Sequence, residues 1–340
     1  PNLLKDLLAQ GKVEEPQYVV AHATHFPLLG PYDSYEEETI RHHMEWAKET
    51  GIDGFIVSWW GISSTTDEGM SKILDIAGKY GRDITIYYET NPCKTKEERI
   101  KRGIEDLMHV LNKYGTHPAF LKINGKPVIF VYSRAMGQVS LDEWAAIVEG
   151  TRKTAKADFI INVEDLTGKS EIYRQMFDGT HIYSRPTPPR SPEAIQEAVQ
   201  EVKSHGKIST VTVSPGFDDT GKMGSQKATV ALRRNGELYE QWWKIALKAN
   251  PDWVLITSWN EWLEGSEIEP NVEYGKKYLE LTRDFVEMFK TPPPNFDKSN
   301  LELSKDRVVA NEPFTVSATA NNVGGLGLSE VKLYIDGVLI

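Results

Sequence analysis

The chain has 340 residues, of which 40% are hydrophobic and 10% aromatic, and its formal net charge is −10. This length suffices for one large domain and a smaller one, and the hydrophobic fraction for a sizeable core. The negative charge argues against nucleic acid as a partner, because phosphates repel it. No apolar run approaches the roughly 20 residues that cross a bilayer, so no membrane span is expected. Cys93 is the single cysteine, which excludes an internal disulfide and a cysteine-based metal cluster.

Short β-branched runs alternate with amphipathic helical stretches along most of the chain. The expected strands are 18–25, 54–60, 84–89, 127–133, 159–164, 179–184, 208–214 and 253–259. The expected helices include 36–50, 96–113, 141–153, 192–204, 239–248 and 274–289. This alternation predicts an α/β fold with a parallel sheet, and eight units over about 290 residues fit a (β/α)8 (TIM) barrel. A doubly wound open sheet is the alternative, although no glycine-rich phosphate loop follows the first expected strand.

Local signals mark the ends of the first expected helix. Asp33 and Ser34 precede a run of glutamates, which predicts that the helix begins with a capping side chain there. Gly51 follows its last turn and is expected to end it with a positive φ.

The composition changes near residue 290. Three consecutive prolines indicate a semi-rigid linker over 291–298. Residues 299–340 alternate strand-forming residues with Gly and Asn turns, which is typical of an all-β sandwich. Such a domain usually has about 100 residues, so we expect a truncated, sandwich-like accessory module. The predicted domains are therefore a catalytic barrel over 1–290, the linker, and a partial β-sandwich over 299–340.

Aromatic and acidic side chains gather where the expected strands end, which is where the active site of a (β/α)8 barrel lies. In chain order these residues are His25, Tyr32, Trp59, Trp60, Tyr88, Glu89, Tyr132, Tyr183, Phe217, Asn260, Glu261, Trp262 and Glu264. Carboxylates among aromatic rings suit the binding and protonation of a sugar. The pattern therefore predicts a carbohydrate site.

Several of these residues have a structural interpretation as well. Trp59 and Trp60 are neighbours in a strand and point to opposite faces, so at most one naturally faces the barrel axis. Glu89 is also interpretable as a structural ion-pair partner. Glu164 and Asp165 are interpreted as solvated loop acids. His22 and His25 have no matched third ligand, so no metal is expected.

Glu261 and Glu264 are the strongest catalytic candidates. Cleavage of a glycoside needs two carboxyl groups, one of which protonates the leaving oxygen. Three residues apart on a continuing strand, their side chains would point to opposite faces, so the chain must turn between them. Trp262 is suited to anchor that turn, and Gly265 gives it conformational freedom. The alternative is a charged loop with a structural salt bridge.

Several stretches resemble glycoside hydrolase family 99, the endo-α-mannosidase family, and the related WbsX-type domains of polysaccharide biosynthesis. They are GIDGFIVSWWG (51–61), YYET (87–90), SPGFDDT (214–220) and ITSWNEWLEGSEIEP (256–270), and the resemblance extends over roughly residues 22–285. It implies a (β/α)8 retaining glycosidase acting on α-mannosides, in which one glutamate acts as a base on the sugar's own 2-hydroxyl. The resulting 1,2-anhydro sugar is then opened by water.

The resemblance also implies roles for single residues. By motif position, Glu261 is the base and Glu264 the acid/base. Glu89 matches a substrate-binding acid, Trp60 or Trp59 a stacking tryptophan, and Tyr132 a tyrosine at the end of the fourth strand.

Two departures from the family pattern concern the substrate. Leu263 stands where the family usually has His, and Phe217 where it usually has Tyr. Both changes remove a hydrogen-bonding group, which weakens discrimination between sugar hydroxyls. They favour, as an alternative, a non-hydrolytic carbohydrate-binding or WbsX-type polysaccharide-biosynthesis protein.

The remaining expectations follow from the predicted activity. The partner is a carbohydrate such as an α-mannan or a glycan, with no cofactor and no metal, and the protein is expected to be a monomer. An extracellular or cell-surface location is expected, although no signal peptide opens this sequence.

Overall fold

The computed structural model describes residues 23–155, 157–165, 173, 175–183, 192–221, 228–291, 300–304, 315–319, 334–335 and 338–339. The chain divides into two compact units, Pro1–Arg283 and Asp284–Ile340. Most of the first expected strand (18–25), of the linker (291–298) and of the accessory module (299–340) lies outside the described residues.

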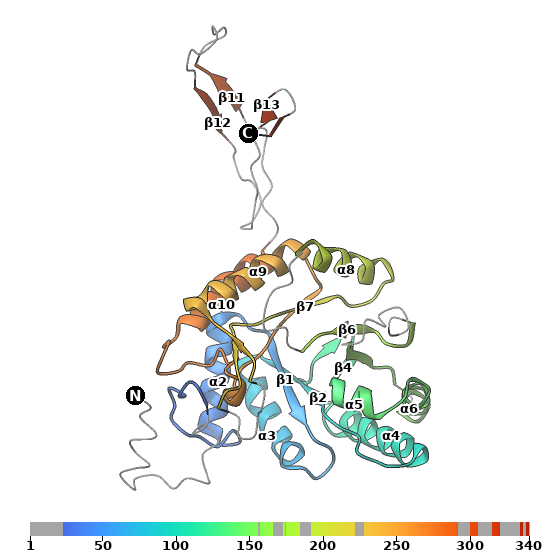
Figure 1. Cartoon of the computed structure of the whole chain (residues 1–340). Helices are drawn as coiled ribbons and strands as arrows, with labels where there is room; N and C mark the ends of the chain where they lie inside the picture. The colour runs from blue at the N-terminus through green and yellow to red at the C-terminus, as the bar shows by residue number, and fades with distance from the viewer. Residues whose placement is uncertain are drawn as a thin grey trace, which may run out of the picture. The chain divides into compact units, whose positions relative to one another are not determined.

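A parallel sheet forms the centre of the first unit (Figure 1). Its strand order is β1 (Gly54–Trp59), β2 (Asp83–Tyr88), β4 (Lys126–Val131), β5 (Ile160–Glu164) and β6 (Gly179–His181). All four neighbouring pairs are parallel. Short β3 (Lys122–Ile123) pairs antiparallel with the start of β4.

A second parallel pair continues this order. β7 (Thr210–Val213) pairs with β10 (Trp253–Ile256), and a parallel bridge joins Gly179 in β6 to Ile208, just before β7. The sheet therefore follows the chain from β1 to β10, and the alternation of strands and helices predicted a parallel sheet correctly.

The helices surround the strands (Figure 1). They are α2 (Glu37–Thr50), α3 (Thr65–Tyr80), α4 (Lys96–Lys113), α5 (Ser133–Gln138), α6 (Leu141–Ala155), α8 (Pro192–Ser204), α9 (Glu237–Ala249) and α10 (Lys277–Lys290). Neighbouring helices pack in pairs, α2 with α3, α4 with α6 and α8 with α9. The sequence pattern did not indicate α5, which begins at Ser133 and ends the fourth strand two residues earlier than expected.

The ends of α2 test the local signals. Gly51 follows the helix with φ 73°, and its backbone N–H donates to Ala47 and Lys48, so the predicted end is confirmed. The predicted start is wrong: Glu36 precedes the helix and makes no side-chain cap. Asp33 accepts a hydrogen bond from the Tyr35 N–H instead, at 2.8 Å, which closes a turn before the helix.

Alternate strand residues pack on opposite faces of the sheet. Trp59, Ile84, Tyr88, Val131 and Val163 belong to the core that the strands share with the helices. Ile56, Tyr87, Phe130, Ile160 and Trp253 pack together on the other, inner face. Burial of each such side chain contributes about 1.5–3 kcal/mol. Every second residue of a strand points to the inner face, so the position of a residue in this alternation (its parity) decides which side chains reach that face.

The second unit contains two antiparallel pairs. β11 (Asn300–Leu303) pairs with β12 (Val316–Thr319), and β13 (Tyr334–Ile335) with β14 (Val338–Leu339). The division at Arg283 lies within α10, before the proline-rich segment. The partial β-sandwich remains a prediction.

Candidate functional site

Polar side chains that point to the same side as the inner-face residues of their strands meet where the inner face of the sheet ends. Ser58, Glu89, Tyr132, Glu164 and Tyr183 share this parity with the inner residues of their strands. Together with the turn after β10 they form what we call the strand-end cluster, which consists of Trp60, Glu89, Tyr132, Tyr183, Glu261 and Glu264.

The turn after β10 carries Glu261 and Glu264. The Glu261 N–H donates to Ser258 Oγ at 3.0 Å, and the Glu264 N–H donates to the Glu261 carbonyl at 3.0 Å. A short 3₁₀ helix, Trp262–Glu264, follows, and Gly265 ends it with φ 55°. A Cβ on Gly265 would lie 2.9 Å from Thr24 Oγ1 and 3.0 Å from the Asp218 carbonyl oxygen, so glycine is required there. The predicted turn between the two acids is confirmed.

Tyr183 is hydrogen-bonded to one of the two acids and is affected by the charge of both. Its hydroxyl donates to Glu264 Oε2 at 3.2 Å. Burial raises the pKa of Tyr183 well above its usual range, and the negative charges of Glu261 and Glu264 raise that pKa further. Both carboxylates are therefore close enough to act electrostatically on the same phenol.

Glu89 is also affected by the charges of neighbouring carboxylates. Its side chain is buried, accepts from Ser58 Oγ at 2.8 Å and has Arg134 Nη1 4.0 Å away. Burial raises the pKa of Glu89, Ser58 and Arg134 oppose this rise, and the carboxylates of Glu164 and Glu264 add to it. A carboxyl with a raised pKa exchanges a proton closer to neutral pH, which suits hydrogen bonding to a sugar.

Trp60 and Arg134 form the exposed part of the cluster. Trp60 is 48% exposed. The Arg134 guanidinium lies 4.7 Å from the Trp60 ring centre and 5.4 Å from that of Tyr132. The backbone N–H of Trp60 donates to Thr66 Oγ1 at 3.0 Å. The loop and the cation hold this indole in one place while much of its surface stays open to solvent.

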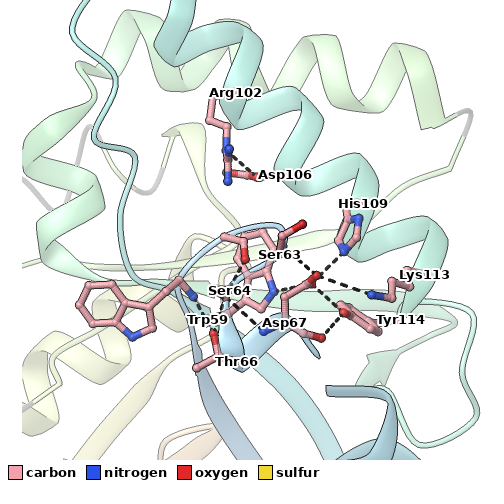
Figure 2. A network of polar contacts seen from close by, with 12 residues as sticks. Trp59, Ser63, Ser64, Thr66, Asp67, Arg102, Asp106, His109, Lys113 and Tyr114 are labelled. Carbon is pink, nitrogen blue, oxygen red and sulfur yellow. Dashed lines mark hydrogen bonds and ion pairs between the residues drawn. The ribbon is translucent and has the colours of Figure 1, made fainter. Parts of the chain in front are cut away.

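Two expected sugar contacts lie on the wrong face of the sheet. Trp59 is fully buried, and its Nε1 donates to Asp67 at 3.0 Å (Figure 2). Tyr88 is 1% exposed, and its hydroxyl donates to Asp106 on α4 at 2.8 Å. Both side chains belong to the core shared with the helices, because their parity is opposite to that of Trp60 and Glu89. They are corrected to structural residues.

Three other candidates bond to one another. The Tyr32 hydroxyl donates to Glu269 Oε2 at 2.6 Å and accepts from Asn260 Nδ2 and Trp262 Nε1, each at 3.2 Å. Glu269 is buried and lies 3.1 Å from His43 Nε2. This network joins the turn after β10 to the segment before α2. A direct contact of these residues with substrate stays a prediction.

His25 belongs to a second buried network. Its Nδ1 lies 2.8 Å from Glu267 Oε1, which also accepts from Arg233 at 2.7 Å and from Asn271 at 3.0 Å. Glu267 is fully buried, so this network stabilises the loop. A substrate contact through His25 stays a prediction.

Phe217 lies on a hairpin beside the turn. β8 (Phe217–Asp218) pairs antiparallel with β9 (Val230–Ala231) and packs against the 3₁₀ helix of Glu264. Phe217 and Leu263 are both partly exposed. Sugar contact by Phe217 also stays a prediction.

Residues below the cluster were not found from the sequence. Glu164 and Asp165 are 3% and 8% exposed, so their interpretation as solvated loop acids is wrong. His181 is buried, with Nε2 2.7 Å from the Tyr87 hydroxyl and Nδ1 2.7 Å from Asn162 Oδ1. The parity of strands β5 and β6 places Asn162 and His181 one layer below Glu164 and Tyr183.

We predict that His181 makes stability depend on pH. Burial lowers its pKa from 6.5 to about 3. Below pH 6.5 the His181 imidazole is protonated in the unfolded chain, whereas in the folded protein it stays neutral down to about pH 3. The free energy of unfolding should therefore fall as the pH falls through this range, by up to about 1.4 kcal/mol per pH unit.

Urea unfolding of the wild type and of His181→Gln between pH 4 and pH 7 measures this contribution. The variant should lose part of the pH slope, whereas a Gln variant of the exposed His205 should keep it. Equal slopes in the wild type and His181→Gln would contradict the assignment.

A parallel strand–helix sheet whose strand ends gather carboxylates among aromatic rings defines a protein of the glycoside hydrolase class. The glycosyl hydrolase family 99 model matches residues 6–289, and the chain belongs to this family.

Known relatives agree with this membership. The glycoprotein endo-alpha-1,2-mannosidase of Mus musculus is 26% identical over 298 residues, covering 78% of this chain and 63% of the relative. The Homo sapiens endo-alpha-1,2-mannosidase-like protein is 28% identical, covering 78% and 64%. This chain thus spans slightly less than two thirds of these relatives.

Solved structures agree on the fold. One structure of the GH99 endo-alpha-mannosidase of Bacteroides thetaiotaomicron superposes with a TM-score of 0.72 at 27% identity, covering 79% of this chain and 89% of that chain. A second structure of this enzyme superposes with a TM-score of 0.69 at 27% identity, covering 79% and 84%. A GH113 beta-1,4-mannanase shares the fold, with a TM-score of 0.52 at 8% identity. In the part of the chain that the structure describes, no helix is both long and apolar enough to cross a membrane.

Proposed function

We propose that this protein is a retaining glycoside hydrolase that cleaves α-mannosidic linkages in oligosaccharides or polysaccharides. The observation that carries the proposal is the turn that brings Glu261 and Glu264 to the same tyrosine, Tyr183, at the end of the sheet. The choice of α-mannosides rests on the names of the relatives, which are endo-α-mannosidases.

The two acids divide the chemistry. Glu261 takes the proton of the sugar's 2-hydroxyl, and the sugar's own O2 then attacks C1 as the glycosidic bond breaks. Glu264 gives its proton to the leaving oxygen. Glu264 then takes a proton from water, which opens the 1,2-anhydro sugar at C1, and Glu261 returns a proton to O2. Two successive displacements at C1 retain the anomeric configuration.

Two further residues are assigned to substrate binding. Glu89 lies within the electrostatic field of Glu264 and is suited to bond a sugar hydroxyl. Trp60 offers an open ring beside Arg134, on which the apolar face of a sugar packs.

A Trp60→Ala variant should therefore bind substrate more weakly. We expect KM to rise about tenfold, which corresponds to about 1.4 kcal/mol, with a smaller change in kcat, because the ring binds ground state and transition state alike. Trp60→Phe, which keeps an aromatic face, should lie between the two. Steady-state kinetics on a mannosyl oligosaccharide measure the effect, and an unchanged KM in the Ala variant would contradict it.

The proposal includes a closed (β/α)8 barrel. The rings of Phe55 in β1 and Trp259 after β10 lie 5.1 Å apart, so the two ends of the strand order approach each other. In the proposed barrel, the first expected strand, 18–25, lies between them and brings the number of strands to eight. We also propose a monomer at an extracellular or cell-surface location, followed by a β-sandwich-like accessory module.

Incubation with a panel of α-1,2-, α-1,3- and α-1,6-linked mannans and oligosaccharides tests the function. Mass spectrometry should detect shorter mannosyl products from at least one substrate, and none with Glu261→Gln. Absence of product from every α-mannoside would contradict the proposed substrate class.

Leu263 and Phe217 favour a second candidate, a carbohydrate-binding or WbsX-type polysaccharide-biosynthesis protein. Both leave apolar groups beside Glu264, where the family pattern has hydrogen-bonding ones. Calorimetry separates the two functions: this candidate requires that a mannan binds and is recovered uncut.

A further inference from the structure

Glu164 is a buried carboxylate with both oxygens engaged. Glu164 is 3% exposed. Oε1 accepts from the Tyr183 N–H at 2.8 Å, and Oε2 accepts from the Ser133 N–H at 3.0 Å. The Tyr87 hydroxyl lies 3.4 Å from Oε2. Burying a carboxylate is costly unless it is hydrogen-bonded, and both oxygens of Glu164 have hydrogen-bond donors.

These bonds join three strand ends. Ser133 follows β4, Glu164 ends β5 and Tyr183 follows β6. The parallel ladder stops at these positions, and the backbone N–H groups beyond it need other acceptors. Glu164 supplies one oxygen to each side.

Tyr183 is fixed at both ends of its peptide. Glu164 accepts from its N–H, and its carbonyl accepts from the Thr257 hydroxyl. The next residue, Ser258, accepts the Glu261 N–H. The phenol ring lies against Tyr132, with ring centres 5.8 Å apart. Since the backbone and the ring are both held, the Tyr183 hydroxyl has a defined position at Glu264.

We propose that Glu164 is a positioning residue that places Tyr183 and, through its hydroxyl, the acid Glu264. The inference rests on the proposed function, in which Glu264 protonates the leaving oxygen. Glu164 does not contact the sugar, because it is buried and each of its oxygens already accepts a backbone N–H.

A Glu164→Gln variant tests this proposal. The amide keeps one acceptor oxygen and presents an NH₂ group to the other backbone N–H, so Ser133 or Tyr183 loses its partner. A displaced Glu264 protonates the leaving oxygen poorly. The loss should therefore depend on the leaving group: an alkoxide needs the proton, whereas fluoride departs without it.

The measurement is kcat/KM on a mannosyl oligosaccharide and on the corresponding α-mannosyl fluoride. Glu164→Gln should lose about 100-fold on the oligosaccharide and stay close to wild type on the fluoride. Tyr183→Phe, which removes the hydroxyl and keeps the backbone, should show the same selectivity. Glu164→Asp, which shortens the reach, serves if the Gln variant does not fold.

Glu143→Gln is the matched control. Glu143 is also 3% exposed and also accepts a backbone N–H, from Ser140 at 2.9 Å, but it pairs with Arg99 on α4. This variant should lower Tm and leave the ratio of the two substrates unchanged.

The outcomes separate the two ideas. If the wild type cleaves both substrates and Glu164→Gln changes them equally, or changes neither, Glu164 does not position the acid and the proposed function stands. If the wild type cleaves neither, the proposed function and this inference both fall.

Discussion

Glutamine in place of Glu264 is expected to lower kcat/KM for an unactivated α-mannoside by roughly 10²–10⁴-fold, because the leaving oxygen loses its proton donor. The same variant should retain most of its kcat/KM on an α-mannosyl fluoride, because this ratio reports the steps up to departure of the leaving group and fluoride needs no proton. Its kcat should still fall, because Glu264 also takes the proton from water in the second step. Glu261→Gln should lose activity on both substrates, since its base is needed to form the anhydro sugar from either. Steady-state kinetics on the two substrates give the comparison.

The control comes from the same loop. Glu273 is exposed and accepts the Phe26 N–H at 3.0 Å, outside the strand-end cluster. Glu273→Gln should keep the wild-type kcat/KM on both substrates. Wild-type hydrolysis by both Glu261→Gln and Glu264→Gln would show that other groups perform the chemistry. Fluoride hydrolysis lost in Glu264→Gln but kept in Glu261→Gln would reverse the two roles.

Replacing Asp67 by Asn is expected to cause the largest loss of stability. Asp67 lies in the first turn of α3 and is 3% exposed (Figure 2). Its carboxylate accepts from Trp59 Nε1 at 3.0 Å and from the Tyr114 hydroxyl at 2.7 Å, and His109 Nε2 lies 2.8 Å away. These three groups meet Oδ1, whereas the Ser63 N–H donates to Oδ2 at 3.2 Å. An amide has a single acceptor oxygen and no charge, so the groups on one side lose their acceptor and those on the other lose a charged partner.

The expected loss is about 3 kcal/mol, as for two hydrogen bonds to a charged group. Burial alone would raise the pKa of Asp67, but the hydrogen bonds of Tyr114, Trp59, Ser63 and His109 lower it from 3.8 to about 2. Because the folded pKa lies below the unfolded one, the stabilisation is complete above pH 3.8 and is lost as the pH falls towards 2.

Urea unfolding of the wild type and Asp67→Asn at pH 7 and pH 2.5 tests both statements. The difference between them should be largest at pH 7 and smaller at pH 2.5. Asp75→Asn is the matched control, because Asp75 lies on the same helix with its side chain 70% exposed. It should change stability by less than about 0.5 kcal/mol. A difference that does not depend on pH would contradict the role of the charge.

The sequence predicted well what depends on periodicity. The β-branched runs and amphipathic stretches placed most strands and helices, and α4 and α8 have the predicted bounds. Positive φ at Gly51 and Gly265 followed from glycine's lack of a Cβ. The hairpin β8–β9 and the helix α5 were missed, because neither has enough residues to show a period.

Strand parity explains the errors at the site. Trp59 and Trp60 were left as alternatives because a sequence does not tell which face of a strand lies inward. Fixing one inner residue, such as Tyr87, would have assigned Glu89 and Trp60 to the site and Tyr88 to the core. Glu164 could also have been found in this way.

Networks that join distant segments had no signal in the sequence. Tyr32 and Glu269 are 237 residues apart, and Tyr183 and Glu264 are 81 residues apart. A hydrogen bond of this kind depends on how strands meet, and no local pattern encodes it. Glu261, Glu264 and Tyr183 were each predicted as site residues, but the hydrogen bond between Tyr183 and Glu264 was not.

The stereochemistry of the first product tests the central claim most directly. ¹H NMR of the wild type acting on an α-mannosyl oligosaccharide should detect the α-anomer of the new reducing end before mutarotation, and no product with Glu261→Gln. A β-anomer formed first would mean that water attacks C1 in a single displacement, which would contradict the two-step chemistry assigned to Glu261 and Glu264.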